Sequence, residues 1–249
     1  MISKKIRKLV EEREHKRGIL VAFEGPDGSG KTTQRKLFKD WLKQQGHQVV
    51  TTKWNSSKLI KPLVKARKSL RALSPSEFCL LHAADFRHRL ENDILPALWE
   101  GKVVIADRYL FTALARDVVR GMELHWVLNA YAPLFWPDMV FYFSVSPETS
   151  GRRIAAERTP SFYESGQDIT DIDNPHESYQ KFIGDVIGEY NALSHIFDFM
   201  TLDAEKPIYD QHREIRQLFQ SGKRRSWSEF NLDAIADWLA YRPEYHDAR

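Results

Sequence analysis

The feature that most constrains how this chain folds is a glycine-rich loop, Gly25 to Thr32 (GPDGSGKT), which follows directly on an apolar run. The run, Ile19 to Phe23, has the composition of a buried strand, and from Lys31 apolar residues recur with the 3.6-residue period of a helix. Strand, loop and helix in this order meet the pattern Gly-x-x-x-x-Gly-Lys-Ser/Thr in the context that phosphate binding requires. The sequence therefore predicts a P-loop; the alternative is a glycine turn that merely joins strand to helix.

The residue types in this loop suit a nucleoside triphosphate with Mg²⁺. Glycines let backbone N–H groups curl around the β- and γ-phosphates, and the helix N-terminus adds the positive end of its dipole. Lys31 supplies a full positive charge, and Thr32 is expected to ligate Mg²⁺. We expect ATP and Mg²⁺ as cofactors, held by Gly25, Asp27, Gly28, Ser29, Gly30, Lys31, Thr32 and Thr33.

Further strand-like runs, separated by helical periodicity, recur near residues 47–52, 103–106, 139–145 and 199–202. A long helix is expected from residue 75 or 76 to residue 100, interrupted or kinked near Pro96. Strands that alternate with helices form parallel sheets covered on both faces. The predicted fold is therefore α/β, a five-stranded parallel sheet in a three-layer α/β/α arrangement.

Charge and cysteine usage limit the partners. The formal net charge is +3, and residues 1–17 hold seven Lys/Arg against three Glu, so that the rest of the chain carries about −1. A near-neutral body argues against a nucleic-acid surface. Cys79 is the only cysteine, which excludes an intrachain disulfide and favours a reducing, cytoplasmic setting. Apolar runs fall far short of the roughly 20 residues of a spanning helix, so no membrane contact is expected.

A second charged motif, Asp107-Arg108, follows the predicted strand at 103–106 directly. Both side chains should emerge at the carboxyl ends of the strands, where open α/β sheets bind ligands. Asp107 either holds Mg²⁺ through water or orients Arg108, and Arg108 can bridge donor and acceptor phosphates with its planar fork. The alternative is a structural ion pair.

Taken together, these segments resemble the thymidylate (dTMP) kinase family from about Gly18 to Phe219. The resemblance is carried by the loop with its flanks (FEGPDGSGKTT), by Asp107-Arg108-Tyr109, and by three further pieces: Leu80-Leu81-His82-Ala83-Ala84-Asp85, Pro137-Asp138 with Pro147-Glu148, and Arg152-Arg153. It implies a nucleotide acceptor as substrate, a homodimer, Asp27 facing the acceptor sugar, and a mobile lid over about residues 152–174. It also implies a catalytic set of Lys31, Asp107, Arg108, Arg153 and Arg158, with Arg152 on the donor nucleotide.

Departures from the family fall almost all on the acceptor side. Lys53-Trp54-Asn55-Ser56-Ser57 replaces the usual Arg-Glu-Pro-Gly-Gly-Thr, and the usual Tyr-Gln pair is Arg116-Asp117. His82 stands where a Phe usually stacks on thymine, and Phe86 replaces a phosphate-binding Arg. The candidates to substitute for that Arg are Arg87, Lys53, Lys58 and Lys61. The predicted acceptor site is Asp27, Lys53, His82, Phe86, Arg87, Arg108, Arg116, Asp117 and Tyr163.

The expected domains are a basic helical arm at residues 1–17, a P-loop kinase domain at 18–220 and an amphipathic helical tail at 221–249. Residues 157–175 are expected to form a long exposed loop. The expected activity is phosphoryl transfer from ATP to a nucleoside monophosphate, with an acceptor other than dTMP left open. Three alternatives remain: a kinase of an unphosphorylated nucleoside or small metabolite, a polyphosphate-dependent nucleotide kinase, and a catalytically silent nucleotide-binding module.

Overall fold

The computed structural model describes residues 17–132 and 134–224. The predicted basic arm, apart from Arg17, and most of the predicted tail lie outside these residues. Among the helices of the described part, none combines the length and the apolar character needed to cross a bilayer.

The described residues form a five-stranded sheet in the order β2-β3-β1-β4-β5, with every neighbouring pair parallel. β1 lies at the centre and is buried along its whole length. The predicted α/β fold with a five-stranded parallel sheet is confirmed. The strands are β1 (Ile19–Glu24), β2 (Val49–Lys53), β3 (Val103–Asp107), β4 (Met139–Ser144) and β5 (Met200–Asp203).

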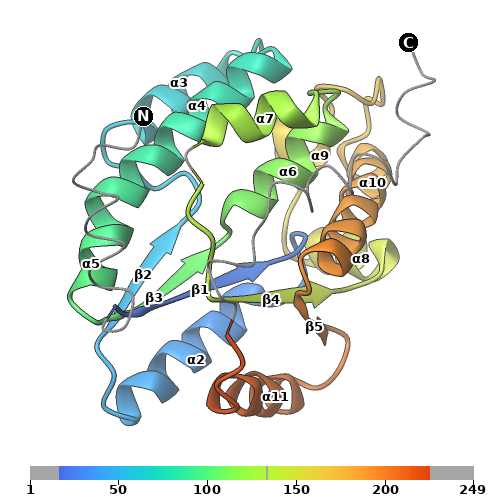
Figure 1. Ribbon diagram of the computed structural model, residues 1–249. Coiled ribbons are helices and arrows are strands. Elements are labelled where there is room, and N and C mark those ends of the chain that lie inside the picture. Colours follow the sequence, from blue (N-terminus) through green and yellow to red (C-terminus); the bar gives the residue numbers. More distant parts are fainter. Residues whose placement is uncertain (1–16, 133, 225–249) are drawn as a thin grey trace.

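Helices cover both faces of the sheet (Figure 1). On one face lie α2 (Lys31–Gln44) and α11 (Ile208–Gln220). The other face carries the remaining layer, which is α3 (Lys61–Ser69), α4 (Pro75–Arg89), α5 (Leu95–Trp99), α6 (Leu110–Val119), α7 (Leu124–Tyr131) and α10 (Pro175–Ile196). The segment after β4 begins with α8 (Pro147–Glu157).

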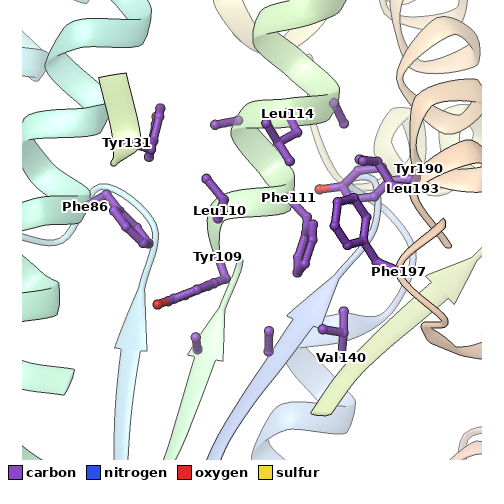
Figure 2. Packing of buried hydrophobic residues seen from close by; sticks show 14 of the residues in the cluster. Phe86, Tyr109, Leu110, Phe111, Leu114, Tyr131, Val140, Tyr190, Leu193 and Phe197 are labelled. Carbon is purple, nitrogen blue, oxygen red and sulfur yellow. The ribbon is translucent and has the colours of Figure 1, made fainter. Parts of the chain in front are cut away.

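Alternate residues of the strands supply two separate cores, as expected for strands that are buried on both faces. β1 gives Leu20 and Ala22 to the larger core, and Val21 and Phe23 to the smaller core under α2 and α11. Figure 2 shows the larger core, in which aromatic and aliphatic side chains of α4, α6, α7 and α10 meet the sheet. The sheet is thus held rigidly, and the loops at its carboxyl edge are positioned by a fixed frame.

The long helix predicted up to residue 100 is interrupted, as expected, but the irregular turn lies before Pro96. A π-helical turn, η1 (Leu90–Ile94), separates α4 from α5, and the Leu95 N–H donates to the Leu90 carbonyl. Proline lacks an N–H, and its ring crowds the carbonyl four residues earlier. The wider turn accommodates both defects without ending the helix.

The prediction of an exposed loop between residues 157 and 175 is wrong in part. The segment contains a short helix, α9 (Phe162–Ser165), with a capping box formed by Ser161 and Glu164 and a left-handed C-cap at Gly166 (φ 77°). Tyr163 and Ser165 are buried. Four residues are too few to show helical periodicity, so the sequence pattern could not reveal this helix.

Candidate active site

The glycine loop lies at the carboxyl end of β1 and leads into α2, as predicted. Gly28 and Gly30 adopt left-handed backbone conformations, with φ of 72° and 80°. A Cβ on Gly28 would lie 2.8 Å from the Ser150 carbonyl, so this position requires glycine on two counts. At Gly30 no described atom lies within 4 Å of the Cβ position, so the loop is open there to the cavity.

Lys31 is buried at the first turn of α2. Its Nζ donates to the Pro26 carbonyl and lies 3.1 Å from Ser29 Oγ. Burial, together with the positive charge of Arg108, lowers the pKa of Lys31 to about 7. A phosphate group beside Nζ would favour the charged form, so this lysine is suited to an anionic ligand.

A cavity of about 720 Å³ opens above the loop. Asp107 lines it from the end of β3 with the Arg35 Nε 3.2 Å from its Oδ2, and Thr32 lines it from α2. Arg35 was not predicted as a site residue, because its position one turn into α2 gives no signal in the sequence. We call this cavity the donor cavity; its described lining also includes Asp27, Gly28, Ser29, Gly30, Lys31, Thr33, Lys53, Arg108, Arg153 and Lys206.

Arg108 turns sharply away from β3. Its backbone is left-handed (φ 68°), and its N–H donates to the Phe23 carbonyl. The guanidinium donates through Nη1 to the Gly25 carbonyl (3.0 Å) and through Nη2 to Asp27 Oδ1 (2.6 Å). A non-glycine residue with positive φ is strained, and such strain persists where the surroundings over-determine it. The arginine is therefore fixed against the phosphate loop.

Glu24 fixes the end of β1 against the start of α6, and it was not predicted as a site residue. Its buried carboxylate accepts hydrogen bonds from the Tyr109 N–H (2.7 Å), Thr112 Oγ1 (2.7 Å) and the Tyr190 hydroxyl (2.9 Å). Burial raises the pKa of Glu24, against the donors that lower it. The side chain ties β1 to α6 and α10 directly behind the loop, and only the fold reveals these partners.

A second cavity, of about 710 Å³, lies beside the first under α3 and α4. We call it the acceptor cavity. Of the described residues, Asp27, Lys53 and Arg108 line both cavities. The acceptor-cavity lining also includes the rings of Trp54, Phe78, His82, Phe162 and Tyr163 and the charged side chains of Lys65, Lys68, Arg71, Arg116, Asp117 and Glu164.

His82 lies within this lining, buried and stacked on Trp54 with ring centroids 5.9 Å apart. Burial holds its pKa well below the ordinary value, so the ring is neutral. Nδ1 lies 2.7 Å from the Phe78 carbonyl, which can only accept, so Nδ1 carries the proton. Nε2 is then an acceptor, 3.3 Å from the Nζ of Lys68, whose pKa burial lowers to about 8.

Comparison with known proteins identifies the family of this chain. A sequence model described as thymidylate kinase matches residues 23–215. The chain belongs to the thymidylate kinase family. A probable thymidylate kinase 2 from Saccharolobus solfataricus is 40% identical over 204 residues, which cover 81% of this chain and 95% of the relative. A probable thymidylate kinase from Pyrococcus horikoshii is 35% identical over 81% of this chain and 96% of its own length. A thymidylate kinase from Bacillus pumilus is 27% identical over 84% and 98%.

Membership of the thymidylate kinase family makes the chain a phosphotransferase. Kinases of this family use ATP and Mg²⁺ in general. The predicted donor-side residues of the loop, Asp107 and Arg108 line one cavity.

The structure does not place the predicted residues Phe86 and Arg87 in the acceptor cavity. Phe86 is fully buried against Tyr109 and Tyr131, with ring centroids 4.9 and 5.4 Å away. Arg87 Nη2 donates to the Tyr131 carbonyl (2.8 Å). Neither residue, nor the suggested Lys58 and Lys61, is among the described residues that line either cavity. On α4, the side chains of Phe86 and Arg87 point to faces that the linear sequence pattern does not distinguish from the face at the site.

Other positively charged side chains, which were not predicted as site residues, line the acceptor cavity. Lys65, Lys68 and Arg71 line the acceptor cavity from α3 and the turn after it. Their signal was present as a Lys-rich helical segment, but nothing in the sequence placed that helix over the cavity. The acceptor cavity is therefore strongly cationic, although the arginine usual in the family is absent.

The loop before α3 is held by Asp85, which also escaped prediction as a site residue. Its carboxylate accepts from the backbone N–H groups of Asn55 (3.1 Å) and Ser57 (2.8 Å) and from Arg89 Nε (2.7 Å). Arg89 is fully buried and also donates to Thr52 Oγ1 (3.1 Å). This pair fixes the segment that carries Trp54 into the cavity.

Arg116 and Asp117, which depart from the family pattern, both line the acceptor cavity from α6. Arg116 Nη1 lies 3.1 Å from Asp27 Oδ2, so Asp27 is held between Arg108 and Arg116. These two arginines keep the pKa of Asp27 far below its ordinary range, against the opposing effect of burial. Burial raises the pKa of Asp117 to about 6.

The predicted lid residues are spread over different surroundings. Arg153 lines the donor cavity and donates to the carbonyls of Gly28 and Ala204, both at 3.1 Å. Arg152 is exposed and contacts Thr149 Oγ1 (3.3 Å). Arg158 is half exposed and forms a bidentate pair with Glu164 (2.7 and 2.5 Å). Tyr163 lines the acceptor cavity, and its hydroxyl accepts from the Leu73 N–H (2.9 Å).

Proposed function

We propose that this protein transfers the γ-phosphoryl group of ATP, bound with Mg²⁺ in the donor cavity, to the phosphate of a nucleoside monophosphate in the acceptor cavity. The observation that carries the proposal is the shared wall of Asp27, Lys53 and Arg108. Phosphoryl transfer needs two nucleotides aligned end to end with their charge neutralised between them. A fixed arginine on the wall between two cavities meets that need.

The loop residues fit ATP and Mg²⁺. The open side of Gly30 gives a phosphate room to approach the backbone, and Lys31 supplies the charge beside it. Thr32 and Asp107 offer the oxygen ligands that Mg²⁺ prefers, on the same cavity. Bound there, the metal would neutralise charge on the transferring phosphate.

We assign the reaction itself to Lys31, Asp107, Arg108, Arg153 and Arg158. Arg153 already faces the donor cavity. For Arg158, the proposal requires the lid to rearrange, because its guanidinium is engaged by Glu164. Arg152 is assigned to the donor nucleotide. Closure of such a lid would exclude water from the phosphates.

The charges in the cavities favour a monophosphate over an unphosphorylated nucleoside. A nucleoside hydroxyl must lose a proton, so one carboxylate would have to act as a base. Asp27 is a poor base, because Arg108 and Arg116 hold its pKa far below the ordinary range. Asp107 is paired with Arg35. A monophosphate is largely ionised near neutral pH, with a second pKa of about 6, and needs no such base.

Other features of the proposal concern the whole chain. We take residues 18–220 as the catalytic domain, place the protein in the cytoplasm, and expect a homodimer. Exposed leucines on and beside α3 and α4 offer an apolar surface for a second copy: Leu59, Leu63, Leu70 and Leu80. Light scattering coupled to gel filtration tests this; twice 29.1 kDa supports the dimer, and 29.1 kDa contradicts it.

The reaction is tested by Lys31→Ala in an ADP-release assay with ATP, Mg²⁺ and a mixture of nucleoside monophosphates. Loss of a preorganised charge that stabilises the transition state costs about 10²- to 10³-fold in rate, and we expect a loss of at least that order. Lys36→Ala is the matched control, because Lys36 is exposed on the same helix. Equal rates for the two variants would refute the role of the P-loop.

A further inference from the structure

The wall of the acceptor cavity contains a buried carboxylate oxygen that the protein itself does not use. Asp117 is 2% exposed and lines the cavity from α6. Among residues 17–132 and 134–224, its Oδ2 has no hydrogen-bond partner. A buried polar atom without a partner destabilises the fold, because it has lost its hydrogen bonds to water and gained none from the protein. Its presence on a cavity wall therefore points to a ligand that completes the hydrogen bond.

The neighbours of Asp117 on this wall are donors. Arg116 is held on one side by Asp27 and lies over the Phe182 ring, 5.4 Å from its centroid. Its other terminal nitrogen, Nη2, is buried and unpartnered within the described part of the chain. Lys68 adds an ammonium group from α3. An ionised carboxylate only accepts, and these cations only donate.

Aromatic rings line the same cavity as the polar groups of Asp117, Arg116 and Lys68. The rings of Trp54 and Phe78 line the same cavity, and His82 lies stacked against Trp54. Few polar groups set among aromatic rings are typical of a site that binds a planar ring and reads its edge. These polar groups and the aromatic rings together suit the binding of a nucleobase.

We propose that Asp117 accepts a hydrogen bond from a ring N–H of the acceptor base, while Arg116 and Lys68 donate to the adjacent carbonyl oxygens. This inference rests on the proposed function and specifies the base. Uracil, thymine, hypoxanthine and guanine carry a ring N–H beside a carbonyl. Cytosine and adenine carry an unprotonated ring nitrogen there, whose lone pair would face the carboxylate. A site with fixed donors and acceptors discriminates by what it leaves unpaired.

The test compares two ligands that differ at this edge alone. Calorimetric titration of the full chain without ATP is expected to show dUMP binding at least about tenfold more tightly than dCMP. In Asp117→Asn the ratio should fall to within about threefold, because an amide can turn to donate to the cytosine ring nitrogen. Asp185→Asn, which removes an exposed carboxylate from α10, should keep the wild-type ratio.

An unchanged ratio in Asp117→Asn, or a wild-type protein that binds dCMP as tightly as dUMP or binds neither, would overturn the inference. The unmodified chain provides a second comparison, dIMP against dAMP, which holds even if the variant fails to fold. dIMP should bind at least about tenfold more tightly, and equal affinities would count against the inference. Failure of the proposed function is distinguishable, because it would leave tight dUMP binding without ADP release.

Discussion

At the scale of single residues, the acceptor site contains a buried ionisable group, the carboxyl of Asp117, whose burial in the charged form destabilises the fold. Burial is the main reason that the pKa of Asp117 rises from 3.8 to about 6, although Arg120, the Cys79 hydrogen bond, Arg116 and Lys68 all oppose the rise. The folded protein thus favours the neutral carboxyl, whereas the unfolded chain ionises at lower pH. Functional sites commonly hold groups with such perturbed pKa values.

The stability of the protein should therefore depend on pH through Asp117. Because its pKa is higher in the folded state, the group stabilises the fold below about pH 4, and this contribution is lost as pH rises through about 6. The loss is on the order of 3 kcal/mol. Urea unfolding of the wild type and Asp117→Asn between pH 4 and pH 7 should show the variant gaining this much relative stability. A stability difference between the variant and the wild type that does not change with pH would show that the pKa of Asp117 is the same in the folded and unfolded states.

At the scale of elements, short segments fix the side chains that face the cavities. α9 is only four residues long, yet it places Tyr163 on the acceptor cavity. Arg120 Nη2 donates to the Tyr163 carbonyl (2.7 Å), and its Nε donates to Asp168 (2.7 Å). The C-cap at Gly166 (φ 77°) allows the chain to turn under α10.

Gly166→Ala should destabilise this segment strongly. An added Cβ would lie 2.5 Å from Phe182 in α10, and the positive φ adds strain of about 1–2 kcal/mol. Gly222 is the matched control, since its φ is 70° and no described atom lies within 4 Å of its Cβ position. The melting temperature should fall further for Gly166→Ala than for Gly222→Ala, with overpacking adding about 1–3 kcal/mol. Equal losses would show that the contact with Phe182 carries no cost.

At the scale of the whole molecule, the fold follows from local patterns and the acceptor site does not. Apolar runs sufficed to predict the five parallel strands, because a strand depends on a run of contiguous residues. The resemblance to the family predicts Phe86 and Arg87 in the acceptor site, whereas helix geometry turns them into the core and toward Tyr131. Glu24 acts through Tyr109, Thr112 and Tyr190, which lie far along the chain and which no local pattern contains.

The positions of Arg108 and Arg153 relative to the two cavities predict different kinetic effects when each is replaced. Arg108 lines both cavities, whereas Arg153 lines the donor cavity and is absent from the described lining of the other. Arg108→Ala should lower kcat by about 10²- to 10³-fold and raise KM for both nucleotides. Arg153→Ala should also lower kcat, but it should raise KM for ATP alone and leave KM for the acceptor unchanged. Steady-state kinetics with each substrate varied in turn measure both, and a selective effect of Arg108 on one nucleotide would contradict the shared wall.

The most direct test of the central claim is ADP release by the full chain with ATP and Mg²⁺, measured on dUMP and dTMP and on the matching nucleosides, deoxyuridine and thymidine. The cationic acceptor cavity and the shared arginine predict turnover of a monophosphate and none of its nucleoside. Turnover of a nucleoside in preference to its monophosphate would contradict the proposed phosphoryl transfer.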